Sequence, residues 1–283
     1  MLYTQIIING LTIAAYLALM ALGLTLLFGV LRIVNFVHGV MLMLGGYAAF
    51  LCTSQLGKTG YYVALVAAPA AVAVFAVLLN LAFFRRFTGN LLSGAVMSIA
   101  LSVVFQNLAW MWFGGDPKRV LTPFEGVYRF GGLIISKHRL VVVLATIAVV
   151  FAVHWFIRHT RTGRALRAVE QNPYAAQLVG IDTSVLSYAT FALSGALAGL
   201  AGALIAPTQL ILPNMGATPL LMAFVVIILG GMGSITGALV AAVVVGLAQS
   251  LITTLWSPQL AVGASFLIAM AILAVRPTGL FGR

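Results

Sequence analysis

Long, uninterrupted apolar stretches constrain the fold of this chain more than any other feature. About nine of them follow one another, and most are close to the ~20 residues that an α-helix needs to cross a bilayer. Their approximate ranges are 5–30, 33–54, 61–84, 92–113, 139–157, 185–206, 217–231, 235–256 and 260–275. The sequence therefore predicts an all-α, polytopic membrane helix bundle with about eight or nine spanning or half-spanning segments, including broken helices.

The composition excludes a soluble fold. Hydrophobic residues make up 63% of the 283 residues, charged residues only 7%, and the mean hydropathy is +1.15. A water-soluble protein of this size has too little interior to bury so much apolar surface. We expect one transmembrane domain over residues 1–283. The lone Cys52 excludes an intrachain disulfide.

The net charge of +11 reflects a shortage of acids rather than a nucleic-acid-binding surface. The basic residues lie in short loops between the apolar segments, where they orient a membrane protein with its basic loops inside. A cytoplasmic C-terminus, in a bacterial inner membrane, places nine basic residues inside: Arg32, Arg85, Arg86, Arg158, Arg161, Arg164, Arg167, Arg276 and Arg283. Six then lie outside: Lys58, Lys118, Arg119, Arg129, Lys137 and Arg139.

No catalytic or metal site emerges from the motifs. The GKT at 57–59 lacks the glycine of a phosphate-binding loop, because that position is Cys52. Ser265 has no later histidine to serve as its base, and the four histidines lack ligand spacing. All four acids fall in predicted loops, so an ion-coupled carrier is disfavoured. We expect a protein that is not an enzyme, binds no cofactor and takes its energy from elsewhere.

The predicted inner loop, about 158–183, contains a short helix with sequence signals for both its start and its end. After a basic helical run at 161–171, Asn172 is a plausible N-cap and Pro173 suits the first helical position. A short helix follows at 174–179, and Gly180 can end it in the left-handed conformation. Asp182 or Thr183 can then cap the next span.

One side of this short helix is apolar, with Ala175, Leu178 and Val179 spaced along it. Two interpretations are equally consistent with the residues. The face can dock on a partner protein, or it can lie on the bilayer surface with the arginines on anionic lipid.

Two apolar segments carry polar or helix-breaking residues. In 29–47, Asn35 and His38 lie within an apolar region with Gly39, Gly45 and Gly46, which favour a break. The second segment, 213–237, contains two prolines and a glycine-rich run. Broken helices of this kind border the substrate paths of many transporters. Three amides lie within other spans, where they either line the path or bond a neighbouring helix: Gln106, Asn107 and Gln249.

Four blocks together resemble the branched-chain amino-acid ABC permeases, most closely the shorter, H-type subunit. Residues 9–47 resemble the opening of these permeases, and TRTGRALRAVEQNPYAAQLVGID at 160–182 resembles their cytoplasmic loop. GGMGSITGALVAAVVVGLAQSL at 230–251 and RPTGLFG at 276–282 resemble their closing segments. The blocks occur in the order of the family and cover nearly the whole chain. Relatives with very similar permeases carry urea, short amides and aromatic acids.

The resemblance implies a permease subunit of a binding-protein-dependent importer for branched-chain amino acids or a similar small polar solute. Its partners would be a second permease subunit, identical or paralogous, two cytoplasmic ATPases that hold ATP and Mg, a periplasmic binding protein and membrane lipid. The coupling residues would be Arg164, Glu170, Tyr174, Ala175, Leu178 and Gly180. The substrate path would be bordered by Asn35, His38, Gly39, Gly45, Gly46, Gln106, Asn107, Gly230, Gly231 and Gly233. The alternative is a stand-alone channel or facilitator for a small neutral solute.

Overall fold

The computed structural model describes residues 2–87, 91–130 and 133–282 and confirms a helical membrane bundle. Nine long helices coincide with the nine predicted apolar segments in the described residues. They are α1 Leu2–Leu31, α2 His38–Leu56, α3 Gly60–Ala82, α4 Leu91–Phe113, α5 Lys137–His159, α8 Thr183–Ile205, α9 Ala217–Gly230, α10 Ile235–Leu255 and α11 Pro258–Val275. Two short helices, α6 Arg161–Gln171 and α7 Pro173–Leu178, lie between α5 and α8. Three 3-10 turns complete the helical structure: η1 Gly57–Thr59, η2 Phe84–Phe87 and η3 Ala206–Thr208.

Length and hydropathy identify the membrane-crossing part. Within the described residues, seven stretches are long and apolar enough to cross a bilayer, and one of them, His38–Arg86, contains both α2 and α3. Helix α9 is apolar but has only 14 residues, about 21 Å at 1.5 Å per residue. It is therefore shorter than the ~30 Å hydrocarbon layer, as expected of a half-span.

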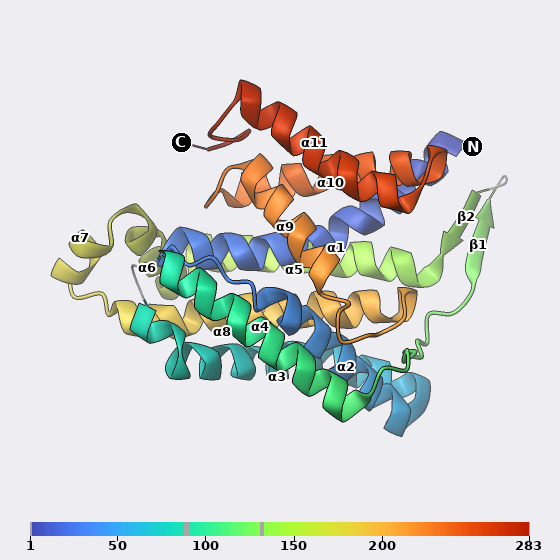
Figure 1. The fold of residues 1–283 in the computed structure, drawn as a ribbon, viewed down its shortest axis with the longest axis horizontal. Helices are drawn as coiled ribbons and strands as arrows, with labels where there is room; N and C mark the ends of the chain where they lie inside the picture. The colour runs from blue at the N-terminus through green and yellow to red at the C-terminus, as the bar shows by residue number, and fades with distance from the viewer. Residues whose placement is uncertain (1, 88–90, 131–132, 283) are drawn as a thin grey trace.

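Helices α1 and α8 form the centre of the bundle. They pack against each other, α3 packs along α8, and α10 packs along α1. Figure 1 shows α3 and α4 on one flank of this central pair and α10 and α11 on the other. Many fully buried side chains accordingly come from α1, α2 and α8, and they include Leu17, Met41 and Phe191.

The bundle has two distinct ends. Figure 1 shows α6 and α7 at one end, with the C-terminus on that side, and the N-terminus at the other end beside a β-hairpin. We call these the α7 end and the hairpin end. Nine arginines are predicted to share one side of the membrane. Those that lie within the described residues are all at helix ends or in loops at the α7 end. The six basic residues of the opposite group fall at the hairpin end.

Two halves of the chain have the same connectivity in opposite directions. Helix α1 reaches the α7 end, the chain turns back into the bundle, and α2, α3 and α4 follow. Helix α8 reaches the hairpin end, the chain again turns back, and α9, α10 and α11 follow (Figure 1). The packing matches too, since α1 lies on α10 as α8 lies on α3. Such inverted repeats are typical of transporters.

The loop between α4 and α5, which we call the outer loop, contains a β-hairpin that the sequence did not predict. Strand β1, Val127–Phe130, pairs antiparallel with β2, Leu133–Ser136. β2 leads directly into α5, and the backbone N–H of Ile134 donates to Gln5 of α1 at 3.3 Å. The hairpin therefore extends outward from the first residue of α5, and its second strand is bonded to the start of α1.

Glycines allow the central helices to approach closely. A Cβ at Gly195 or Gly199 would lie within 3 Å of α3 atoms, at the carbonyl of Val72 and that of Ala68 respectively. The Gly195–Gly199 spacing therefore serves packing within the bundle.

Candidate functional site

The break between α1 and α2 spans residues 32–37 and lies before the glycines of α2. Helix α1 ends as Arg32 adopts a positive φ of 53°, while its N–H still donates to Phe28 at 2.9 Å. Residues 33–37 then return into the bundle, so α2 starts inside it. His38 lies level with Met20 and Gly23 of α1, and Gly23 is eight residues, about 12 Å, from the end of that helix.

Asn35 lies in the non-helical segment between α1 and α2, and its side chain bonds the backbone just before α2. Its Oδ1 accepts from the N–H of Val37 at 3.0 Å, which mimics a capping bond at the start of α2. Ser98 of α4 accepts from the N–H of Phe36 at 3.0 Å. Asn35 is fully buried, and its Nδ2 has no hydrogen-bond partner among the described residues. A buried amide donor is thus left available beside the break.

His38 connects three segments at the start of α2. Its Nε2 lies 3.1 Å from the carbonyl oxygen of Met20, and its Nδ1 lies 3.4 Å from Oγ of Ser194. Because a carbonyl only accepts, Nε2 carries the proton, and Nδ1 accepts from the serine hydroxyl. Gly23 makes room for the ring, since a Cβ there would lie 2.7 Å from Cε1. His38 therefore joins α2 to both central helices, α1 and α8.

The second break brings the start of α9 to the start of α2. After η3 the chain returns from the hairpin end to Gly216, directly before α9. A Cβ on Gly39 would lie 2.8 Å from the carbonyl oxygen of Gly216, so the two backbones touch. The rings of Phe36 and Phe224 also meet, with centroids 5.0 Å apart. Two helix N-termini, each with a partial positive charge, thus converge inside the bundle. We call this place the crossing.

The remaining path candidates on α2 and α4 have other neighbours. Gly45 packs against the backbone of Gly199 of α8, and Gly46 packs against the Met215 side chain, which precedes α9. Helix α4 packs on η2 and α2 at the edge of the bundle. On this helix Gln106 is half-buried, and the exposed Asn107 donates from Nδ2 to the carbonyl of Val103 at 2.8 Å.

The glycines at 230–233 lie at the α7 end, not at the crossing. They form the turn between α9 and α10, where Gly231 and Gly233 have φ of 97° and 90°. The C-terminal segment packs on this turn, with the N–H of Phe281 donating to Gly230 at 3.1 Å. A Cβ on Gly233 would lie 3.8 Å from Oε1 of Glu170 in α6. The turn therefore adjoins the predicted coupling loop.

The predicted coupling loop, about residues 158–183, folds as the sequence predicts. The Asn172 side chain accepts from the N–H of Ala175 at 3.0 Å, and Pro173 is the first residue of α7. Gly180 has φ of 82°, and Asp182 caps α8 by accepting from Ser184 at 2.8 Å. Each capping prediction is confirmed, and together these bonds hold α7 at a defined position.

Helix α7 presents its apolar side chains outward. Ala176 is buried, whereas Tyr174, Leu178 and Val179 are 70%, 72% and 77% exposed, and Ala175 is exposed as well. A contiguous apolar group of this kind marks an interaction surface.

The basic helix α6 packs against α7. Its Leu166 and Val169 are buried, while Arg164 is exposed and donates to the carbonyl of His159 at 3.1 Å. Glu170, by contrast, lies near Gly29 as well as Gly233, on the bundle side of the loop.

Sequence reasoning missed the partners that make the crossing. Ser98 and Phe224 contact Phe36, Ser194 contacts His38, and Gly216 contacts Gly39. Each of these four partners is an ordinary small or apolar residue in a membrane helix or its flank. Only the three-dimensional arrangement brings them together.

Comparison with known proteins identifies the family. Residues 6–275 match the family described as branched-chain amino acid transport system / permease component. The chain is 30% identical to the high-affinity branched-chain amino acid transport system permease protein BraD of Pseudomonas aeruginosa, over 99% of this chain and 96% of that protein. It is 28% identical to the corresponding LivH of Escherichia coli K12, over the same shares.

More distant similarity extends to another import system, the ribose import permease protein RbsC of Escherichia coli K12. That protein is 28% identical over 81% of this chain and 72% of its own length. No solved structure matches the chain. The match over nearly the whole chain, together with the helical membrane bundle, shows that the protein belongs to the family of permease components of branched-chain amino acid transport systems.

Proposed function

We propose that this chain is a membrane-spanning permease subunit of a binding-protein-dependent ABC importer. Its solute is a branched-chain amino acid or a similar small polar solute. ATP hydrolysis on two separate cytoplasmic ATPase subunits, which hold ATP and Mg, drives transport. A second permease subunit, identical or paralogous, completes the membrane part, and a periplasmic protein delivers the solute.

One observation carries this proposal beyond family membership. Helix α7 is capped at both ends and exposes Tyr174, Leu178 and Val179. A stand-alone channel needs no such element, whereas an importer driven by another chain needs a rigid contact that transmits motion. We therefore assign α7 as the helix that docks in an ATPase groove, with the α7 end and the C-terminus in the cytoplasm of an inner membrane.

The crossing is the proposed part of the solute path within the bundle. Two helix N-termini and the spare Nδ2 of Asn35 favour a carboxylate or another electron-rich group there. Because His38 joins the crossing to both central helices, motion of α1 against α8 would alter the crossing directly. Alternating access would then change which end of the bundle the crossing communicates with.

The docking role of α7 is tested with Leu178→Asp, which places a charge on the exposed face. In liposomes holding the chain with its partner permease and ATPases, we expect loss of ATPase binding and loss of ATP-driven leucine uptake, supplied through the binding protein. Gln171→Glu adds the same charge to an exposed position of the same loop outside α7 and is expected to retain both. Unchanged ATPase binding in the Leu178→Asp complex would refute the docking role.

A further inference from the structure

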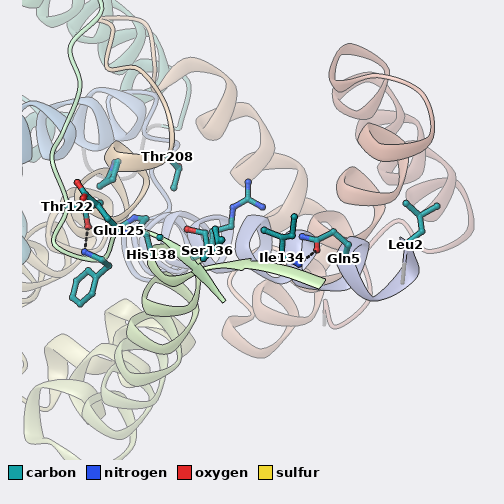
Figure 2. A pocket seen from close by; sticks show the side chains of 13 residues that line it. Leu2, Gln5, Thr122, Glu125, Ile134, Ser136, His138 and Thr208 are labelled. Carbon is teal, nitrogen blue, oxygen red and sulfur yellow. Dashed lines mark hydrogen bonds between the residues drawn. The ribbon is translucent and has the colours of Figure 1, made fainter. Parts of the chain in front are cut away.

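An open cavity lies at the hairpin end and shares no lining residue with the crossing or with α7. Its volume is about 800 Å³, and α1, the outer loop, the hairpin, the start of α5 and η3 line it. Figure 2 shows its labelled side chains in a row from Thr122 and Glu125 to Gln5 and Leu2. We call this cavity the outer chamber. It combines a carboxylate, Glu125, and a guanidinium, Arg139, with apolar walls that include Val127 and Ile134.

A second, narrower cavity continues from the outer chamber into the bundle. It has a volume of about 270 Å³ and lies among α1, α5, the end of α8 and α10. Arg139 and Thr208 line both cavities, so the two adjoin at these residues. We call this second cavity the inner chamber. Hydroxyl groups dominate its polar lining, among them those of Thr12 and Ser250.

A polar stripe on α1 follows both chambers. Gln5 lines the outer chamber, whereas Asn9, Thr12 and Tyr16 line the inner one. Their spacings of four, three and four residues put them on one helix face. One further turn leads to Met20, whose carbonyl binds His38 at the crossing. The chambers therefore lead from the hairpin end toward the crossing, and polar side chains facing a cavity in a membrane helix mark a solute pathway.

Arg139 is held in place where the chambers meet. Its Nη1 donates to Oδ1 of Asn9, which also accepts from Gln5 at 3.3 Å. One of five guanidinium N–H donors serves this bond, and the planar group can still offer two parallel N–H donors to a carboxylate. The neighbouring His138 donates from Nε2 to the carbonyl of Leu204 at 2.9 Å, and this bond fixes the orientation of its ring beside Arg139.

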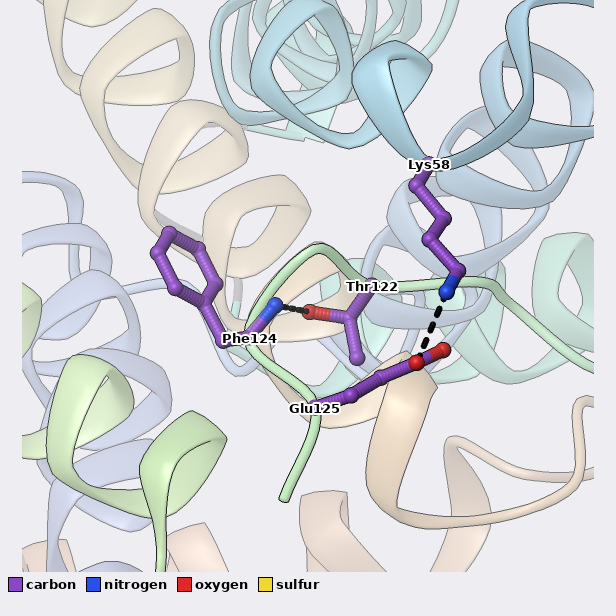
Figure 3. A network of polar contacts seen from close by, with 4 residues as sticks. All are labelled: Lys58, Thr122, Phe124 and Glu125. Carbon is purple, nitrogen blue, oxygen red and sulfur yellow. Dashed lines mark hydrogen bonds and ion pairs between the residues drawn. The ribbon is translucent and has the colours of Figure 1, made fainter.

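Glu125 is the acidic counterpart in the outer chamber. Figure 3 shows Lys58, from the α2–α3 turn, reaching one oxygen of this carboxylate, at 2.7 Å. A carboxylate has two oxygens with several acceptor sites, so Glu125 can accept from Lys58 and from a bound ammonium group together. The outer chamber thus offers an anionic carboxylate and a cationic guanidinium along one apolar wall.

We propose that these chambers bind the solute as a zwitterionic amino acid with an aliphatic side chain. Arg139 binds the α-carboxylate, Glu125 binds the α-ammonium group, and Val127 and Ile134 contact the side chain. The proposal rests on the importer function proposed above and adds to it the residues that bind the solute and the route by which the solute enters. A neutral amide would leave both charges unmatched, and an aromatic acid would leave Glu125 without its ammonium partner.

The test uses chemical protection rather than transport. In a Cys52→Ser background, Thr12→Cys places a thiol in the inner chamber, and Ser54→Cys places one on an exposed position outside both chambers. The assembled permease–ATPase complex is reconstituted without binding protein, and alkylation rates are measured with L-leucine, L-leucinamide or 4-methylpentanoate. We expect leucine alone to slow alkylation at Thr12→Cys several-fold, with no effect at Ser54→Cys.

Removing the guanidinium provides the decisive comparison. Arg139→Gln should raise the leucine concentration needed for half-protection about ten- to hundred-fold, the effect of losing a charged hydrogen-bond pair. Arg129→Gln removes the same charge from the exposed hairpin, outside the chambers, and should leave protection unchanged. Size-exclusion profiles of the complexes confirm that each variant assembles.

Two results separate the possible failures. The first concerns a complex that imports leucine with ATP. If leucine and leucinamide protect it equally, or if protection survives Arg139→Gln, the zwitterion site is overturned and the importer function stands. A complex that neither imports leucine nor shows protection overturns both.

Discussion

At the scale of single residues, His38 shows how a polar group becomes part of an apolar bundle. Its two ring nitrogens bind one group on each central helix, and the ring occupies the space that Gly23 leaves. A buried polar side chain contributes to stability only while its hydrogen bonds are made. The same ring also fixes the start of α2, so stability and the position of the crossing depend on one residue.

Substitution of His38 tests this arrangement. His38→Leu removes both bonds and leaves the Ser194 hydroxyl without its acceptor, which should cost about 1–3 kcal/mol of stability. His38→Gln retains a donor for the Met20 carbonyl and should cost less. Thermal unfolding of the purified protein in detergent measures the difference, and equal midpoints for the two variants would contradict the assigned hydrogen bonds.

Gly45 provides a second residue-scale test. It packs on the backbone of Gly199, and a methyl group added there would overlap atoms that cannot move aside cheaply. Gly45→Ala should therefore destabilise the protein by about 1–3 kcal/mol. Gly263→Ala is the matched control, because a Cβ at Gly263 in α11 meets nothing within 4 Å. Equal unfolding midpoints for both variants would show that α2 and α8 are not so closely packed.

At the scale of elements, α7 owes its position to its two ends rather than to its length. A helix of six residues is too short to be stable alone, so the Asn172 cap and the left-handed Gly180 determine where it starts and stops. The bond from Gln177 to Thr183, at 3.1 Å, further attaches it to α8. Motion of α7 can therefore pass directly to a central helix.

The positive φ of Gly180 makes a specific prediction. Gly180→Val places a β-branched side chain in the left-handed region at a cost of about 1–2 kcal/mol, whereas Gly180→Asn is tolerated there. We expect Gly180→Val to lower hydrogen-exchange protection across residues 172–180 and to weaken ATP-driven uptake, with Gly180→Asn close to the unsubstituted protein. Identical exchange in the two variants would contradict the importance of this terminus.

The elements differ in how far the sequence predicted them. Hydrophobic length located the nine long helices, and local capping chemistry located α7, because both signals lie within a few neighbouring residues. The hairpin was missed, since its two four-residue strands are too short to show a pattern. The crossing was only half predicted: Asn35 and His38 stand out as polar, but the contact of Gly39 with Gly216 joins residues far apart in the chain. The polar stripe from Gln5 to Tyr16 had a helical period that could have revealed it.

At the scale of the whole molecule, the inverted repeat and the charge distribution agree. The repeat places the two breaks back to back, so one path can open to either end by moving one half against the other. The basic residues of α6 and of the helix ends beside it gather at the α7 end, which faces the cytoplasm in the orientation proposed above. The two ends of the molecule therefore differ in charge, and the two repeats meet at the crossing between these ends.

Sided labelling tests the orientation. In a Cys52→Ser background, Gln171→Cys at the α7 end should react with a membrane-impermeant thiol reagent only after the membrane is opened. Asp116→Cys, in the outer loop, should react in intact spheroplasts. The reverse pattern would place α7 outside and would remove the basis for ATPase docking.

The most direct test of the importer is accumulation against a gradient. Liposomes holding the complete complex, with ATP inside the compartment that faces α7 and binding protein with labelled leucine on the other side, should concentrate leucine above its external level. They should stop doing so when ATP is replaced by a non-hydrolysable analogue. Leucine that merely equilibrates across the membrane, at the same rate with and without ATP, would contradict the importer and identify the chain as a facilitator.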